Sequence, residues 1–190
     1  FEIKKLMSKV EENKKMEAPI IFYGSSTIRL WKSLNEDFKN VNVINLGFGG
    51  AYIDSLSKNF NPLINFINPK AIVIYLGGND LNLNLSPREI IFKIKKFIKK
   101  IYNRYPDTNI GYITIKPSLE REKKLSDIKK INEGVKLITD DFPNLIYIDI
   151  YEKLLVNGEV TSKFLLQDGL HLNKKGYKIL TKAVTEMIIN

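Results

Sequence analysis

Residues 71–80 read AIVIYLGGND, and this stretch decides the fold class. Its first six residues form a continuous apolar run, which is typical of a strand buried on both faces of a parallel sheet. The run stops at two glycines and the polar pair Asn79 and Asp80, a composition that indicates a turn. A helix start follows, with Ser86 as the N-cap and Pro87 at the first helical position. The stretch therefore predicts a strand, a turn and a helix in that order.

The same order of strand, turn and helix recurs on both sides of this stretch. Short apolar runs predict four more strands, at residues 20–23, 41–44, 110–115 and 145–150. Apolar residues at helical spacing predict helices at residues 1–17, 28–31, 53–60, 86–105, 121–140 and 173–188. Five strands that alternate with helices predict an α/β fold with a doubly wound parallel sheet, and residues 1–190 are expected to form a single domain.

The charge of the chain is strongly basic, because 30 Lys and Arg residues face 21 Asp and Glu residues, for a formal net charge of +9. Such an excess invites a nucleic-acid interpretation. However, the cations are overwhelmingly lysines, and the lysines of residues 93–100 and 123–130 occupy the polar positions of amphipathic patterns. Arginine, which is preferred for bidentate recognition of bases and phosphates, is rare. We therefore expect no nucleic-acid partner.

The scarcity of cysteine and histidine limits the possible chemistry. The chain has no cysteine, which excludes disulfides, thiolate metal sites and a cysteine nucleophile. It has one histidine, and one histidine with scattered carboxylates does not make a transition-metal site. No apolar run approaches the roughly 18 to 20 residues needed to span a bilayer. We therefore expect neither a metal nor a membrane span.

The start of the chain leaves the localisation open. The first residue is Phe1 rather than a methionine, so we expect that an upstream piece has been removed or omitted. A secreted protein with a cleaved signal peptide and a cytoplasmic protein are both compatible with this start. The sequence also leaves the oligomeric state open.

Unusual polar motifs follow the predicted strands. Ser25 and Ser26 come after the first strand, and glycine-rich turns follow the second and third. Ligands of doubly wound sheets bind at the carboxyl ends of the strands, so these motifs should meet at one rim. The only histidine, His171, comes three residues after Asp168. The connection over residues 151–172 is long enough to bring both back over the middle of the sheet.

Each motif has a structural and a catalytic interpretation. The serines could be helix caps, the glycine run a plain turn, and Asn79 a turn residue that tolerates left-handed geometry. In the catalytic interpretation, a serine after the first strand is the nucleophile. The backbone N–H of Gly50 and the side-chain amide of Asn79 then stabilise an oxyanion. An Asp-x-x-His loop lets Asp168 hold Nδ1–H of His171, which leaves Nε2 free to act as a base.

Taken together, these motifs resemble the SGNH hydrolases, the superfamily also called GDSL esterases and lipases. Four blocks occur in the family's order, FYGSSTIRLW at residues 22–31, NLGFGG at 45–50, GGND at 77–80 and DGLH at 168–171. The resemblance implies that Ser26 is the nucleophile and that Asp168 and His171 are the acid and base. It also implies that the backbone N–H groups of Ser26 and Gly50, together with Asn79, form the oxyanion hole. The sequence departs from the family pattern at Ser25, where the family name calls for Asp.

The resemblance implies a flavodoxin-like sheet of order 2-1-3-4-5, no cofactor and hydrolysis of carboxylic esters through an acyl-enzyme. A short acyl group, such as acetyl on a carbohydrate, is the substrate expected from it, so the partner is a small-molecule or carbohydrate ester. Two alternatives are an acyltransferase with the same triad and a sugar or alcohol acceptor, and a non-catalytic ligand-binding module of the same fold. Loops at residues 80–86, 116–122 and 151–167 should line the pocket with modest apolar walls from Leu81, Leu83, Leu85, Pro117 and Phe164.

Overall fold

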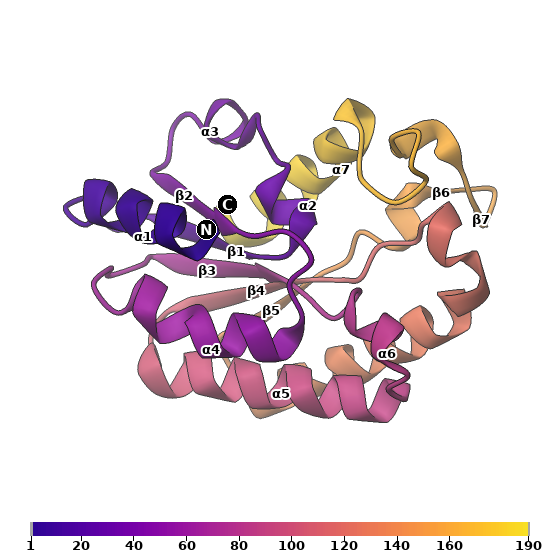
Figure 1. Ribbon diagram of the computed structural model, residues 1–190, viewed down its shortest axis with the longest axis horizontal. Helices are drawn as coiled ribbons and strands as arrows, with labels where there is room; N and C mark the ends of the chain where they lie inside the picture. The colour runs from indigo at the N-terminus through magenta and orange to yellow at the C-terminus, as the bar shows by residue number, and fades with distance from the viewer. Residues whose placement is uncertain (1, 190) are drawn as a thin grey trace.

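A five-stranded parallel sheet forms the centre of the protein in a computed structural model that describes residues 2–189 (Figure 1). The order of its strands is β2-β1-β3-β4-β5, which confirms the predicted α/β fold and sheet order. The strands are β1 (Ile20–Gly24), β2 (Val43–Gly47), β3 (Ala71–Tyr75), β4 (Asn109–Ile113) and β5 (Leu145–Ile148).

The strand register brings the motifs together. Gly24, the last residue of β1, is paired with Gly47 of β2 on one side and with Tyr75 of β3 on the other. The first three strands therefore end at the same level, because their last residues lie side by side. The serine and glycine motifs that follow these strands consequently start from one rim of the sheet.

Helices cover both faces of the sheet (Figure 1). On one face, apolar residues of four helices pack against the strands, namely α1 (Glu2–Asn13), α4 (Ile53–Ile64), α5 (Pro87–Arg104) and α6 (Leu125–Ile138). On the other face lie α2 (Ser26–Arg29), α3 (Leu34–Asp37) and α7 (Lys174–Val184). Strand side chains alternate between the two cores, as Ile21 and Tyr23 face the first and Ile20 and Phe22 the second. Among residues 2–189, no helix combines the length and the apolar character that a membrane crossing requires.

Several element boundaries differ from the sequence-based expectation. The first helix, expected over residues 1–17, ends at Asn13, and Phe1 lies outside the described residues. Between this helix and β1, Ala18 adopts a left-handed φ of 42° and is followed by Pro19. The second strand starts at Val43, later than expected, and continues through Gly47.

The helix expected at residues 121–140 also starts differently. A 3-10 segment, η2 (Leu119–Lys124), precedes α6, because Arg121 has the non-helical dihedrals φ −111° and ψ 24°. Shorter helical turns occur elsewhere in the described chain, at η1 (Asp80–Leu83), η3 (Thr139–Asp141) and the π-turn η6 (Thr185–Ile189).

The connection between β5 and α7 is more ordered than an irregular loop. It contains the 3-10 turns η4 (Glu152–Leu154) and η5 (Ser162–Phe164), and a small antiparallel hairpin of β6 (Leu155–Val156) and β7 (Glu159–Val160). Asn157 and Gly158 form the two-residue hairpin turn with positive φ values of 54° and 80°. An isolated bridge between Leu165 and Leu172 then closes the loop that carries Asp168 and His171.

Candidate active site

Ser26 is the first residue of α2, directly after the central strand β1. The strand must end in a glycine, because a Cβ on Gly24 would lie 2.3 Å from the carbonyl oxygen of Tyr75 in the neighbouring strand β3. Ser25 is the N-cap residue of α2, but its hydroxyl makes no capping hydrogen bond. The hydroxyl of Ser26 instead makes a hydrogen bond across the rim to His171. Capping by these hydroxyls therefore does not explain the two serines.

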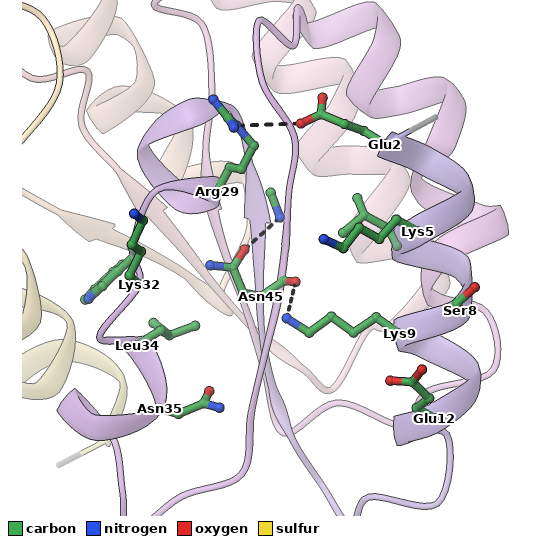
Figure 2. A pocket seen from close by; sticks show the side chains of 13 residues that line it. Glu2, Lys5, Ser8, Lys9, Glu12, Arg29, Lys32, Leu34, Asn35 and Asn45 are labelled. Carbon is green, nitrogen blue, oxygen red and sulfur yellow. Dashed lines mark hydrogen bonds and ion pairs between the residues drawn. The ribbon is translucent and has the colours of Figure 1, made fainter.

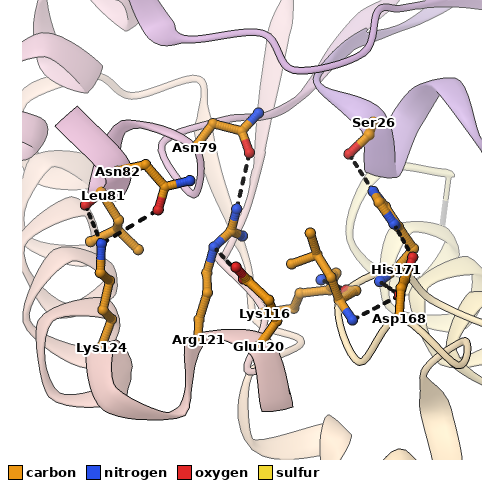
Figure 3. A network of polar contacts seen from close by, with 11 residues as sticks. Ser26, Asn79, Leu81, Asn82, Lys116, Glu120, Arg121, Lys124, Asp168 and His171 are labelled. Carbon is orange, nitrogen blue, oxygen red and sulfur yellow. Dashed lines mark hydrogen bonds and ion pairs between the residues drawn. The ribbon is translucent and has the colours of Figure 1, made fainter.

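Asp168, His171 and Ser26 form a hydrogen-bonded chain (Figure 3). Nδ1 of His171 lies 2.6 Å from Oδ2 of Asp168, and Nε2 lies 2.9 Å from Oγ of Ser26. An ionised carboxylate only accepts hydrogen bonds, so the ring proton lies on Nδ1 and Nε2 accepts the hydroxyl proton of Ser26. This is the geometry that general-base activation of a serine requires.

The environment of Asp168 keeps its carboxyl group ionised. The hydrogen bond from the His171 side chain, followed by the backbone N–H of His171, lowers the pKa of Asp168 to about 2. Its Oδ1 accepts backbone hydrogen bonds from Leu170 and His171, each at 2.9 Å. The carboxylate therefore holds both the imidazole ring and the turn that carries it.

Contacts from the end of β4 hold the loop in place. Nζ of Lys116 donates to the carbonyl oxygen of Leu170, and the backbone N–H of Glu120 donates to the carbonyl of Gly169 at 3.2 Å. Within the loop, the N–H of Leu166 donates to the carbonyl of His171 at 2.7 Å. The long connection thus brings His171 within hydrogen-bond distance of Ser26.

The two other predicted residues lie at the ends of β2 and β3. Gly50 has a φ of +63°, a conformation that disfavours other residues, and a Cβ at this position would meet no atom within 4 Å. Within residues 2–189, the backbone N–H groups of Ser26 and Gly50 donate to no acceptor. The Asn79 amide donates to the carbonyl oxygen of Ala51 at 3.0 Å and retains a second N–H. These N–H groups are available to stabilise an oxyanion.

Asp80 supports the helix beside the site. Its two carboxylate oxygens each accept from the backbone N–H of Ile53, the first residue of α4, at 3.2 Å. Burial raises the pKa of Asp80 to about 6. The side chain is almost inaccessible to solvent, which fits a structural acceptor better than a base.

Sequence reasoning missed two buried cations beside Ser26. Lys116 and Arg121 line a small cavity of about 10 Å³, together with Tyr75 and His171. Burial, which outweighs the other causes, lowers the pKa of Lys116 to about 7. Lys116 follows β4, so the rule that located the other motifs could have found it. The burial of Arg121 has no comparable signal in the sequence.

The expected apolar walls are largely wrong. Leu81 is buried in the core on the α4–α5 face, Leu85 packs against the same core, and Phe164 packs against the opposite core. Leu83 is exposed to solvent. Leu81 and Phe164 are used for packing because their 3-10 turns, η1 and η5, lie against α5 and α7. The loop after β4 instead contributes cations to the site.

A larger cleft of about 620 Å³ lies elsewhere, between α1 and the segment of α2 and α3 (Figure 2). Arg29 lies 3.7 Å from Glu2 across it, and Nζ of Lys9 donates to the carbonyl of Asn45 at 3.1 Å. Neither Ser26 nor His171 lines this cleft. Among residues 2–189, the structure also groups no three His, Cys, Asp or Glu side chains that could hold a metal ion.

Known proteins resemble this chain in sequence or in fold. The human platelet-activating factor acetylhydrolase IB subunit alpha1 is 22% identical over 188 residues, which cover 95% of this chain and 79% of that protein. The lipase/acylhydrolase from Enterococcus faecalis superposes with a TM-score of 0.75 at 23% identity, covering 89% of this chain and 94% of that one. The family 3 carbohydrate esterase from Clostridium thermocellum gives a TM-score of 0.68 at 20% identity, covering 90% and 95%.

A family model also matches most of the chain. The model of the GDSL-like Lipase/Acylhydrolase family matches residues 22–179, which run from β1 into α7 and include all four sequence blocks. The chain therefore belongs to the GDSL-like lipase/acylhydrolase family, within the SGNH superfamily, and is a serine ester hydrolase.

Proposed function

We propose that this protein hydrolyses carboxylic esters with short acyl groups through a covalent acyl-enzyme on Ser26. The observation that carries the proposal is the unbroken chain of hydrogen bonds from Asp168 through His171 to Ser26, with contacts of 2.6 and 2.9 Å. A serine hydroxyl is a weak nucleophile until a base accepts its proton, and this arrangement supplies that base in the required tautomer.

In the first half of the reaction, Oγ of Ser26 attacks the ester carbonyl carbon and its proton passes to Nε2 of His171. The carbonyl oxygen becomes an oxyanion, which the backbone N–H groups of Ser26 and Gly50 and the amide of Asn79 stabilise. The C–O bond to the alcohol then breaks, and His171 returns the proton to the departing alkoxide. The acyl group remains on Ser26 as an ester.

In the second half, a water molecule takes the place of the alcohol. His171 accepts a proton from this water as its oxygen attacks the acyl carbon, and the same donors stabilise the second oxyanion. Collapse of the intermediate breaks the bond to Oγ, and His171 returns the proton to Ser26. The carboxylic acid leaves and the enzyme is regenerated. The ionised carboxylate of Asp168 stabilises the imidazolium in both halves.

The space beside Ser26 favours a small acyl group. The cavity next to the nucleophile measures about 10 Å³ and is bounded by Tyr75, Lys116 and Arg121. This is about the space of one water molecule and offers no tunnel for a long acyl chain. The name of the acetylhydrolase agrees with an acetyl group and that of the carbohydrate esterase with a carbohydrate, so an acetylated carbohydrate is our candidate substrate.

Hydrolysis of p-nitrophenyl acetate, butyrate and octanoate tests the proposal in one set of assays. We expect kcat/KM to be highest for acetate, and Ser26→Ala and His171→Ala each to lose about 10⁴-fold or more, because neither variant retains an activated nucleophile. Ser25→Ala is the matched control, since the neighbouring hydroxyl makes no capping bond, and it should retain most of the activity.

The opposite results are equally clear. Full activity in Ser26→Ala would contradict the mechanism, and a preference for octanoate would contradict the short acyl group.

The same assays with an acetylated monosaccharide, followed by detection of free acetate, test the carbohydrate substrate. If an added alcohol became acetylated instead of acetate being released, the enzyme would be an acyltransferase with the same triad.

A further inference from the structure

Arg121 is a buried cation at the rim that holds the candidate active site. Its side chain is only 6% exposed, and its guanidinium lies against the backbone of Gly78, where a Cβ would approach Nη1 to 3.0 Å. The nearest carboxylate oxygen belongs to Glu120, 3.6 Å from Nε, and within residues 2–189 this Nε makes no hydrogen bond. Burying a charge without a tight partner is costly, so packing alone is a poor explanation for an arginine here.

The hydrogen bond that Arg121 does make is directed at the oxyanion site. Its Nη2 donates to Oδ1 of Asn79 at 3.0 Å, and Figure 3 shows the guanidinium pointing at this amide. On its other side, Nδ2 of Asn79 donates to the carbonyl oxygen of Ala51. A guanidinium can only donate and a backbone carbonyl can only accept. The two partners therefore allow a single orientation of the Asn79 amide.

This orientation matters because an amide has two opposite ends. If the group turned by half a rotation, Oδ1 would replace the NH2 group and would repel a developing oxyanion. Arg121 prevents that turn, since Nδ2 and the guanidinium are both donors and would face each other. A charged donor on Oδ1 also polarises the amide and strengthens the remaining N–H as a donor.

We propose that Arg121 is a positioning residue for ester hydrolysis, which holds the Asn79 amide with its NH2 group toward the oxyanion. The inference rests on the proposed function of Ser26, Asn79 and His171. It differs from a general structural role, in which Arg121 would only stabilise η2, where its backbone N–H donates to the carbonyl of Ser118 at 3.1 Å. In a general structural role, loss of Arg121 would lower activity whether or not Asn79 were present.

A double-mutant cycle with p-nitrophenyl acetate separates these roles. Loss of an oxyanion donor in Asn79→Ala should lower kcat by about 10²- to 10³-fold. We expect Arg121→Met to lower kcat by about 10- to 100-fold with little change in KM, because the interaction acts in the transition state. In the Asn79→Ala background the same substitution should change kcat by less than about twofold, since the group it acts through is gone. Arg104→Met, at the distant end of α5, is the control for loss of an arginine.

Two results would overturn the role of Arg121. One is an equal loss from Arg121→Met with and without Asn79, and the other is an unchanged kcat in Asn79→Ala. If Arg121→Met does not fold, as thermal unfolding by circular dichroism would show, the cycle is repeated with Arg121→Lys. The lysine keeps the charge but not the planar donor, and its loss of kcat should again disappear in the Asn79→Ala background.

Ser26→Ala distinguishes failure of this inference from failure of the proposed function. If Ser26→Ala is inactive but the cycle is additive, the mechanism stands and only the role of Arg121 is wrong. If Ser26→Ala remains fully active, the mechanism is wrong, and the positioning role that depends on it is wrong too.

Discussion

Lys116 shows how one buried residue can link the stability of the protein to pH. Its side chain is 1% exposed, and its ammonium group donates to the carbonyl of Leu170, next to His171. Burial is the main cause that lowers the pKa of Lys116 from 10.5 to about 7. Between these two pH values the unfolded chain binds a proton at this lysine that the folded chain largely lacks. The contribution of Lys116 to the free energy of unfolding therefore increases as the pH rises from about 7 to 10.5.

We predict that Lys116→Met reduces this pH dependence. The free energy of unfolding of the wild type, minus that of the variant, should increase between pH 7 and pH 9.5, by up to about 3 kcal/mol. Urea unfolding at both pH values measures this difference. Lys123→Met, which removes an exposed lysine from the same loop, should show no such trend. If the difference in unfolding free energy between wild type and Lys116→Met stayed constant with pH, the lowered pKa of Lys116 would be contradicted.

Ser26, Gly50, Asn79, Asp168 and His171 could be picked out as candidates at the level of residues, and the structure joins three of them, Ser26, His171 and Asp168, by hydrogen bonds. Each is marked by position, as a serine or glycine after a strand or as the only histidine with an aspartate nearby. Lys116 also follows a strand, but nothing in the sequence indicates that it or Arg121 is buried, because most lysines and arginines are solvated. Their burial follows from how the loop after β4 folds across the rim, which is a tertiary property.

Among the elements, the start of α7 has a direct effect on the candidate site. Asn173 is its N-cap, and its Oδ1 accepts from the backbone N–H groups of Lys175 and Gly176 at 2.9 and 3.1 Å. Its Nδ2 donates to the carbonyl oxygens of Lys163 and Leu165, on the other side of the loop that carries His171. One side chain therefore joins the helix to both ends of the loop.

We predict that Asn173→Ala lowers both stability and activity. Loss of the cap should cost about 1 to 2 kcal/mol of unfolding free energy, and the loosened loop should lower kcat for p-nitrophenyl acetate. Ser86→Ala is the matched control, because Ser86 caps α5 in the same way but does not touch the catalytic loop. It should lose a similar amount of stability and keep its kcat. An unchanged kcat in Asn173→Ala would show that the loop is held without this residue.

The elements that sequence reasoning predicted well are those with a long pattern or a strong boundary signal. The start of α5 was correct, since Ser86 accepts from the backbone N–H of Glu89 and Pro87 opens the helix. The start of α6 was wrong because Arg121 leaves helical geometry to bury its side chain. The β6–β7 hairpin was missed, since strands of two residues are too short for any periodicity to show.

At the scale of the whole molecule, the strand order decides where the chemistry can occur. β1 lies between β2 and β3, so the residues that follow these three strands are neighbours in space although they are far apart in sequence. The connection from β5 starts at the opposite edge of the sheet and returns over the rim to bring His171 to Ser26 (Figure 1). Periodicity predicts the five strands but not their order, and the order came from the resemblance to a family.

The most direct test of the central claim is to find which side chain a serine-directed reagent modifies. After reaction with a fluorophosphonate ester, which stays bound to an activated serine, peptide mass mapping identifies the labelled residue. The account predicts one phosphonyl group on Ser26, a loss of esterase activity in proportion to labelling, and much slower labelling of His171→Ala. A label on Ser25 or elsewhere, or full activity in protein that is completely labelled on Ser26, would contradict it.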